Sequence, residues 1–272
     1  MKKLVEMLAC VAVLTVACGS ADGSGTSATV APTTTVAPTT TVAPTTTVWV
    51  VHTTTLQTFG DVGGSSSPTI GVNGEPLIST TDITIGVDGN PLISHMDIPN
   101  SDLELYVCDD PACSSGTNVT LETDGNVGFR ASLVIGVTGN PVIAHMDRAN
   151  EDLELYVCDD PACSSGTNVT LETTGSVGWE PAVTISDNGN PVISHARWNW
   201  DEADGDLELY VCDNLACSSG TNVTLVTTGS VGVFSSITIG DDGNPVIAHQ
   251  EYAKGDLEFA QVMMPVSVVA DQ

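Results

Sequence analysis

Basic residues and aromatic residues are both scarce in this chain. Only 6 of the 272 residues are Lys or Arg, against 34 Asp and Glu, and the formal net charge is -28. Nucleic acids and anionic membrane surfaces repel such a chain at long range, which argues against both as partners. Aromatic residues make up 4%, whereas 26 glycines and 14 prolines are present. This composition predicts a turn-rich β protein with few helices.

No hydrophobic run in the sequence is long enough to span a bilayer. Lysines precede the apolar residues 7–16, and the small residues at 16–19 offer a cleavage point. This order is typical of an export signal, so we expect residues 1–17 to be a signal peptide. Cleavage before Cys18 would resemble a bacterial lipoprotein signal and make that cysteine the acylated first residue, although Thr15 departs from the usual pattern. An ordinary secretory signal is the alternative.

The next segment, residues 18–48, is rich in Thr and Pro. The hexapeptide Ala-Pro-Thr-Thr-Thr-Val occurs three times in tandem, at 31–36, 37–42 and 43–48. Proline and β-branched threonine favour an extended, solvated chain, so we expect a disordered stalk that carries a folded domain of residues 49–272. The sequence therefore predicts an exported protein of the cell envelope that contacts the membrane only through a lipid anchor, or a secreted one.

The part of the chain after the stalk consists of internal repeats. The motif Gly-Asn-Pro-[Leu/Val]-Ile-[Ser/Ala]-His begins at Gly89, Gly139, Gly189 and Gly243, at spacings of 50, 50 and 54 residues. The first three units continue with Asp-Leu-Glu-Leu-Tyr-Val-Cys-Asp and a Cys-x4-Cys loop. Tandem units of this length indicate a repeat architecture.

The second unit predicts four strands, at 133–137, 142–146, 153–158 and 169–173, with a tight turn at 138–140. Alternating and β-branched residues favour strands, and the glycine in the turn suits a hairpin. Four antiparallel strands in about fifty residues, repeated in tandem, are typical of a β-propeller blade. We therefore predict an all-β, β-propeller-like array of about four four-stranded blades.

The last unit lacks the segment that forms the fourth strand in the others. Residues 54–58 match 169–173, so we expect this N-terminal strand to complete the last blade and close the ring. Residues 70–79 form a stub with only the first two strands of a blade. Because four blades are the lower limit for a closed propeller, an open array and a ring shared between chains remain alternatives.

Two motifs carry a resemblance to a known family. They are Ile-Gly-x-Asp-Gly-Asn-Pro-[Leu/Val]-Ile-[Ser/Ala]-His and Cys-Asp-[Asp/Asn]-x-Ala-Cys-Ser-Ser-Gly-Thr. Over residues 54–262 the chain resembles exported bacterial propeller repeats related in pattern to the sialidase-like Asp-box (BNR) propellers. The Asp-box itself is met only in fragments, at 187–189 and 241–243, where no Trp follows. The resemblance implies the propeller architecture and leaves the function open.

Catalysis of the sialidase kind is not supported by the residues. Sialidases hold the substrate carboxylate with three arginines and use a Tyr-Glu nucleophile with an Asp acid. The arginines after the signal, Arg130, Arg148 and Arg197, stand at unequal repeat positions, and the strand glutamates, Glu154 among them, recur in every unit. Because an acid/base pair needs one asymmetric site, we expect these glutamates to be solvated or to stabilise turns. We predict no catalytic residue and a protein that is not an enzyme.

Six cysteines form three local pairs. The pairs are Cys108 with Cys113, Cys158 with Cys163, and Cys212 with Cys217. In an exported protein we expect three disulfides, with zinc as the alternative.

One histidine recurs at the end of the second strand of each unit: His95, His145, His195 and His249. In a ring of four blades these imidazoles could converge on a metal or an anion. We favour the alternative that each is a packing residue capped by a neighbouring carbonyl, and we predict no metal and no cofactor.

The connections between strands predict where a ligand binds. The turns after the first strand and the loops after the third are nearly identical in every full unit, and antiparallel pairing places them on one face. The other connections vary, and they hold every basic residue after the signal and three of the four tryptophans, two of them in a four-residue insertion. We predict a ligand-binding site on this variable face, formed by Trp198, Trp200, Arg197, Trp179, Arg148 and Arg130. Neutral drift of exposed loops is the alternative.

Aromatic rings beside guanidinium groups are typical of carbohydrate or peptide recognition. The sequence therefore favours a surface-tethered, non-catalytic module that binds a carbohydrate or a protein at the cell surface. A structural or adhesive envelope protein and, less favoured, a sialidase-like glycoside hydrolase are the alternatives.

Overall fold

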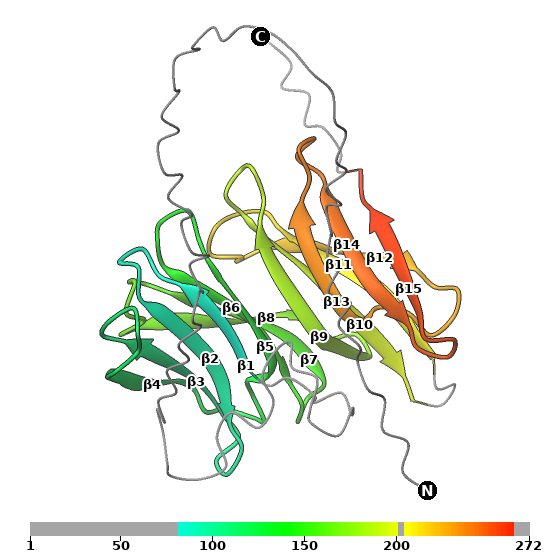
Figure 1. The fold of residues 1–272 in the computed structure, drawn as a ribbon. Helices are drawn as coiled ribbons and strands as arrows, with labels where there is room; N and C mark the ends of the chain where they lie inside the picture. The colour runs from blue at the N-terminus through cyan, green and yellow to red at the C-terminus, as the bar shows by residue number, and fades with distance from the viewer. Residues whose placement is uncertain (1–80, 201–203, 264–272) are drawn as a thin grey trace, which may run out of the picture. The chain divides into compact units, whose positions relative to one another are not determined.

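The structure, a computed structural model, describes residues 81–200 and 204–263. These belong to one compact unit that spans residues 52–272. Fifteen strands and no helix occur in the described part of the chain (Figure 1). None of the described residues forms a helix long and apolar enough to cross a membrane. The predicted signal peptide, stalk, stub and strand at 54–58 lie outside the described residues.

The strands form four antiparallel sheets in chain order. Sheet 1 consists of β1 (Thr81–Ile85), β2 (Pro91–Asp97), β3 (Asp102–Cys108) and β4 (Gly116–Glu122). Sheet 2 consists of β5 (Phe129–Ile135), β6 (Pro141–Asp147), β7 (Asp152–Cys158) and β8 (Gly166–Glu172). Sheet 3 consists of β9 (Ser176–Ile185), β10 (Pro191–Asn199), β11 (Asp204–Cys212) and β12 (Gly220–Val226). Sheet 4 consists of β13 (Val233–Ile239), β14 (Pro245–Glu251) and β15 (Asp256–Gln261).

The all-β, propeller-like class predicted from the repeats is confirmed. Each sheet is a meander, and the first strands of successive sheets contact one another, as in neighbouring propeller blades. The predicted hairpin turn is also confirmed, because the amide of Gly139 (φ 88°) donates to the carbonyl of Gly136. The first strand begins earlier than predicted, since Arg130 (φ 53°) forms an irregularity that continues β5 back to Phe129. The fourth strand begins earlier as well, where Gly166 pairs with Cys158 directly after the disulfide loop.

Neighbouring sheets pack face to face through equivalent residues. Leu103 and Leu105 of β3 are fully buried against Leu133 of sheet 2. Leu153 and Leu155 of β7 pack between sheets 2 and 3 in the same way. Leu207 and Leu209 of β11 pack between sheets 3 and 4. Burial of one such side chain contributes about 1.5–3 kcal/mol. The repeated leucines of the third strands are therefore a recurring part of the apolar contact between sheets.

A Val-Gly pair before sheets 2, 3 and 4 joins each of them to the preceding sheet by a backbone hydrogen bond. The amide of Val127 donates to the carbonyl of Ser101 at 3.0 Å, and the next two units repeat this bond at 2.9 Å. Gly128 (φ 77°) follows, and a Cβ at that position would lie 2.9 Å from Cα of Leu103. Only glycine fits both the backbone conformation and this close approach. The pair therefore fixes the spacing of successive sheets.

Sheet 4 has three strands among the described residues, so its fourth strand, predicted at 54–58, is untested. Leu257 and Phe259 of β15 are 84% and 68% exposed. Their counterparts in sheet 2, Leu153 and Leu155, are fully buried under sheet 3. One face of sheet 4 therefore carries exposed apolar side chains at the same repeat positions as the face of sheet 2 that sheet 3 covers.

Three disulfides close the loops between third and fourth strands. They join Cys108 to Cys113, Cys158 to Cys163, and Cys212 to Cys217, each with 4.9 Å between the Cα atoms. By loop entropy, each such bond stabilises the fold by about 2 kcal/mol.

We expect these bonds to be present in protein taken from its native source. Reduction should then raise the intact mass by about six hydrogens, two for each bridge. Alkylation without reductant, read by mass spectrometry, should leave all six of these cysteines unmodified. Modification of any of them in undenatured, non-reduced protein would contradict the assignment.

Candidate functional site

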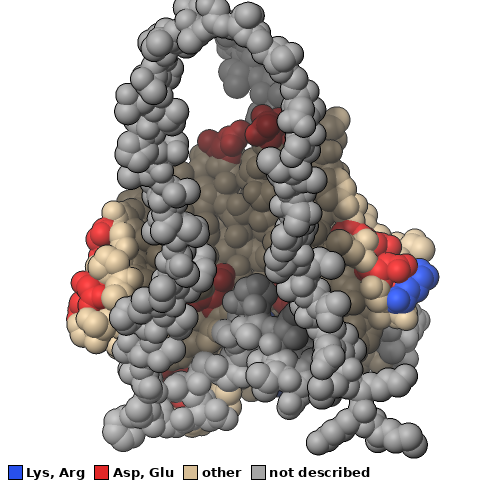
Figure 2. Space-filling view, in the orientation of Figure 1, with Lys and Arg blue, Asp and Glu red and all other residues tan. Residues whose placement is uncertain are grey.

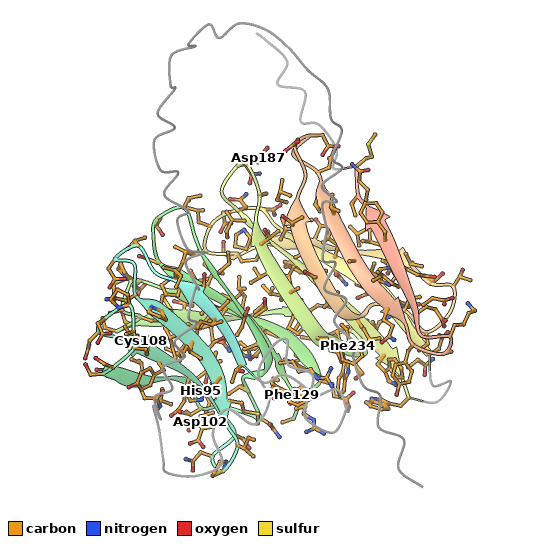
Figure 3. All side chains as sticks on the ribbon, in the orientation of Figure 1. His95, Asp102, Cys108, Phe129, Asp187 and Phe234 are labelled. Carbon is orange, nitrogen blue, oxygen red and sulfur yellow. A yellow bond between two sulfur atoms is a disulfide. The ribbon has the colours of Figure 1, made fainter. Side chains whose placement is uncertain are left out.

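The connections between strands lie at two opposite ends of the sheets. Figure 3 shows Asp187, in the turn between β9 and β10, at one end, and Phe129 and Phe234, at the starts of β5 and β13, at the other. The end of Asp187 carries the Gly-Asn-Pro turns and the disulfide loops. The opposite end carries the connections that differ between repeats, and we call it the variable face.

Five aromatic rings form a continuous run across the variable face, in the order Phe129, Trp179, Trp200, Trp198 and Tyr252. Consecutive ring centroids are 6.0, 5.3, 5.9 and 6.1 Å apart, each pair with edge-to-face geometry. Sheets 2, 3 and 4 all contribute rings. An edge-to-face contact contributes about 0.5–1.5 kcal/mol beyond area burial. The aromatic run is therefore an ordered surface that crosses three sheets.

The four-residue insertion of the third repeat builds the middle of the aromatic run. β10 and β11 have 9 residues each, whereas β6 and β7 have 7. The extension carries Trp198, which pairs in register with Gly205. A Cβ at position 205 would lie 2.9 Å from Cε3 of Trp198. Gly205 thus lets the indole ring lie directly on β11.

Ser176 fixes two of the rings. Its hydroxyl oxygen accepts hydrogen bonds from Nε1 of Trp179 at 2.7 Å and from Nε1 of Trp200 at 3.2 Å. Both indole N–H groups are thereby satisfied within the protein, and the exposed parts of these two rings are apolar. Trp200 and Tyr252 are 59% and 60% exposed, whereas Trp179 and Trp198 are half-buried.

A partly buried ion pair lies beside the aromatic run. The guanidinium of Arg130 pairs with the carboxylate of Glu180, and it lies 5.2 Å from the ring centroid of Phe129 and 5.8 Å from that of Phe234. Burial, together with the nearby charge of Arg148, lowers the pKa of Arg130 to about 10, so this group stays charged at neutral pH. The carboxylate of Glu180 also accepts a hydrogen bond from the backbone amide of Phe234.

Arg130, Glu180 and Phe234 occupy the same position in three successive repeats. Each has a left-handed backbone, with φ of 53°, 50° and 52°. Three equivalent irregularities at strand starts therefore present three different side chains, which meet one another across sheets 2, 3 and 4.

The remaining basic residues differ in their surroundings. Arg148 is exposed, and its guanidinium lies 4.8 Å from the ring centroid of Phe129. Arg197 pairs with Asp206 and lies 3.4 Å from Glu208. The hydrogen bond that the guanidinium of Arg197 donates to Asp206 raises the pKa of Arg197. In Figure 2 acidic side chains lie at several places on the visible face and basic ones at a single edge.

Five of the six predicted site residues meet at the aromatic run: Trp179, Trp198, Trp200, Arg130 and Arg148. Arg197 does not join them in this way. Successive side chains of a strand point to opposite faces, so Arg197 and Trp198 of β10 diverge. Arg197 instead takes the position of Asp147 and binds the acidic residues of β11.

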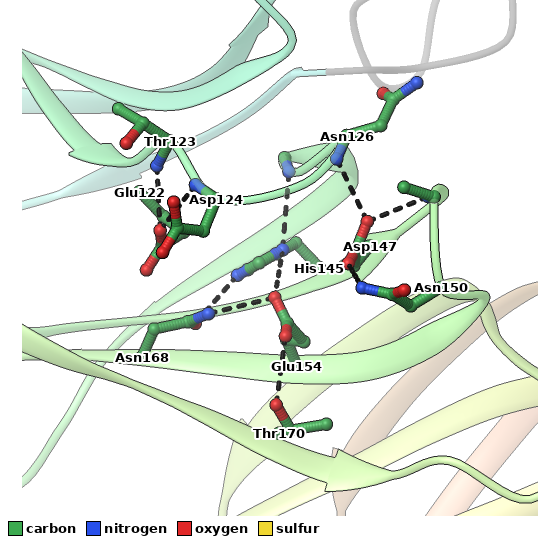
Figure 4. Close-up of polar contacts among 12 residues, drawn as sticks. Glu122, Thr123, Asp124, Asn126, His145, Asp147, Asn150, Glu154, Asn168 and Thr170 are labelled. Atoms are coloured by element: carbon green, nitrogen blue, oxygen red, sulfur yellow. Dashed lines mark hydrogen bonds and ion pairs between the residues drawn. The ribbon is translucent and has the colours of Figure 1, made fainter.

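The recurring histidines lie in polar networks inside their own sheets (Figure 4). In sheet 2, Nε2 of His145 lies 3.1 Å from Oδ1 of Asn168, and the amide of Gly128 donates to Nδ1 at 3.3 Å. The side-chain amide of Asn168 donates to Glu154 at 2.9 Å, and the hydroxyl of Thr170 donates to the same carboxylate at 3.1 Å. Because Nδ1 accepts, Nε2 carries the proton in the neutral ring.

The equivalent residues of sheets 1 and 3 repeat the contacts among histidine, asparagine, threonine and glutamate. The expectation of a carbonyl cap is therefore wrong for His145, because a side chain 23 residues away and a backbone amide bind its ring. The expectation of solvated glutamates is also wrong, because Glu104, Glu154 and Glu208 are buried. Desolvation lowers the pKa of His145 to about 4 and also lowers that of His195.

Both ring nitrogens of His145 and of His195 are bound within their own sheets, which does not support a convergent imidazole site. Three metal-ligating side chains do not gather anywhere in residues 81–200 and 204–263. The Asn-x-Thr segments of the fourth strands bind these histidines and glutamates, so they have a role in packing.

Sequence reasoning missed three members of the site: Phe129, Tyr252 and Glu180. A signal was available for Phe129 and Glu180, because they fall in the variable segments that precede each first strand. Only the last repeat has a tyrosine at this position. The packing of sheet 4 on sheet 3 brings the ring centroid of Tyr252 to 6.1 Å from that of Trp198.

Several solved structures are similar to this chain at low identity. An endo-arabinase from Bacteroides thetaiotaomicron VPI-5482 is 14% identical with a TM-score of 0.48, over 74% of this chain and 80% of that chain. An intramolecular trans-sialidase from Ruminococcus gnavus is 14% identical with a TM-score of 0.46, over 67% and 42%. An α-L-arabinofuranosidase from Lactobacillus brevis is 16% identical with a TM-score of 0.43, over 71% and 74%.

No protein-family model and no curated protein sequence matches the chain. The function therefore has to be argued from the residues of the variable face.

Proposed function

We propose that the protein is an envelope-tethered recognition module that binds a glycan through the aromatic run on its variable face. The observation that carries this proposal is the run of five rings across three sheets, with Trp200 and Tyr252 more than half exposed. Exposed aromatic rings on otherwise polar surfaces mark binding sites. The predicted signal and stalk, and the disulfides, are consistent with a site outside the cytoplasm.

A binding role without catalysis is supported by the state of Glu180, a carboxylate beside the aromatic run. Glu180 is bound by the guanidinium of Arg130 and by the amide of Phe234. A glycosidase needs a carboxylic acid free to protonate the glycosidic oxygen and a second carboxylate beside it. Glu180 is engaged with other groups and does not suit that role.

Changing Trp198 and Trp200 to Ala in the full chain should weaken glycan binding at least tenfold. Each ring contributes about 1–2 kcal/mol through stacking and burial, and 1.4 kcal/mol corresponds to a factor of ten. Binding is measured on a glycan array and then by calorimetry with the best glycan. Leu215→Ala is the matched control, because Leu215 is an exposed apolar residue on the opposite loop face.

Equal affinity in the double variant would place the site elsewhere. Turnover in a fluorogenic glycosidase panel would favour the hydrolase alternative. Absence of any glycan or protein ligand for the native chain would favour a structural envelope protein.

A further inference from the structure

The aromatic run also indicates which class of glycan the proposed function concerns. We infer that the ligand is an elongated, uncharged polysaccharide chain that lies along the run from Phe129 towards Tyr252. This inference rests on the proposed function and adds the charge and the shape of the ligand.

The shape of the site favours a chain over a compact ligand. The rings follow one another at centroid distances of 5.3–6.1 Å, from sheet 2 to sheet 4. Rings that touch each other edge to face leave no space between them for a small molecule, so a ligand has to lie on top of them. A ligand that contacts all of the rings must itself be long.

The chemistry of the exposed ring surface favours apolar C–H contacts. The N–H groups of Trp179 and Trp200 are both used by Ser176. These two indoles therefore offer stacking surface without a free donor for a carboxylate, sulfate or phosphate. Sugar rings that stack on aromatic side chains do so through their C–H faces.

The charges on the variable face argue against an anionic ligand. Arg130 is neutralised by Glu180, and Lys254 lies 3.6 Å from Glu251. Arg148 is exposed, but it is one positive group on a chain with a net charge of -28. An acidic polymer would be repelled by this field, whereas an uncharged chain is not.

The same charges argue against a basic protein as the ligand. A net charge of -28 attracts cations in general, yet all four basic residues after the predicted signal, Arg130, Arg148, Arg197 and Lys254, lie on the variable face. Three of them pair with the carboxylates of Glu180, Asp206 and Glu251 on the same face, which removes these groups as binding points for a basic partner. An uncharged glycan remains as the class that this surface favours.

The inference is tested with the full chain and oligosaccharides of graded length. The probes are neutral gluco-, arabino- and galacto-oligosaccharides from disaccharide to octasaccharide, acidic galacturonate oligomers of the same lengths, and polylysine. We expect affinity for one neutral series to rise at least tenfold with length and to be the same at low and high salt, since no charge pair is formed.

Tyr252→Ala shortens the run at one end and provides the sharper readout. This variant should remove the gain from the longest oligosaccharides, about fivefold for one ring, and leave the shortest ones unaffected. Leu215→Ala is again the matched control and should bind every length as the native chain does.

Four results would overturn the inference. Binding of galacturonate that weakens with salt and is lost in the Trp198 and Trp200 double variant would leave glycan recognition standing and show an acidic ligand. Binding of polylysine that is lost in the double variant would show a basic protein partner. Affinity that does not change with length would show a compact ligand, and failure to bind any probe would overturn the proposed glycan function as well.

Discussion

Deleting residues 50–60 is expected to lower the free energy of unfolding by several kcal/mol. The reason is that β15 is an edge strand among the described residues, with Leu257 and Phe259 exposed where equivalent leucines are buried. Residues 55–63 read Thr-Leu-Gln-Thr-Phe-Gly-Asp-Val-Gly, close to Thr-Leu-Glu-Thr-Asp-Gly-Asn-Val-Gly at 120–128. We expect residues 54–58 to pair with β15. Val62 would then occupy on sheet 4 the place that Val127 has on sheet 1.

Chemical denaturation of the full chain and of the deletion variant measures this effect. The matched control removes the same number of residues, 37–47, from the predicted stalk, and should leave the unfolding curve unchanged. If the segment completes sheet 4 of a second molecule, light scattering will show a dimer that the deletion abolishes. Identical curves for all three proteins would rule out a role for the segment in closing the array.

Acidification from pH 7 to pH 5 is expected to cost about 2 kcal/mol of stability through His145 alone. Desolvation by burial lowers the pKa of His145 from 6.5 to about 4 in the folded state. Between these values the unfolded chain binds the proton more readily than the folded chain. The contribution of His145 is therefore complete above pH 6.5 and is lost progressively as the pH falls towards 4.

Denaturant unfolding at pH 7 and pH 5 tests this expectation in the native chain and in His145→Gln. The variant should be less stable at pH 7, because it disturbs the contacts with Asn168 and Gly128, but it should lose less on acidification. Burial raises the pKa of Glu154, which acts in the opposite sense, and the comparison of the two proteins largely cancels that effect. An equal loss in both proteins would show that His145 does not titrate as expected.

Much of the fold could be predicted because the same sequence pattern of strands and turns recurs in each repeat. A short run of apolar and β-branched residues predicted the second strand, apolar residues in partial alternation predicted the third, and the glycine turn predicted the hairpin between the first two. The start of β5 could not be predicted from this pattern. Arg130 has a left-handed backbone conformation, which the residue type arginine does not indicate. The partner of His145 was missed because Asn168 lies on a strand that is not adjacent to β6.

The site was predicted in its centre and not at its ends. Trp179, Trp198 and Trp200 could be grouped because rare residues fall in connections that share one face. Arg197 was grouped with them by proximity in sequence, whereas the alternation of side chains along β10 separates it from Trp198. Tyr252 belongs to another sheet, and its contribution depends on the packing between sheets 3 and 4.

The equivalent interfaces between sheets have a consequence for assembly of the native molecule. The same leucines and the same Val-Gly pair join each described pair of neighbouring sheets, so this apolar part of an interface does not encode which two sheets it joins. A newly made sheet 3 can dock on sheet 1, or on a sheet of another molecule, with nearly the same gain in buried area. Correct order then depends on the short connections that bring the adjacent sheet into place first. Refolding at high concentration should yield chain-exchanged oligomers, and because each disulfide closes within one repeat, thiol assays would not distinguish these products from the native protein.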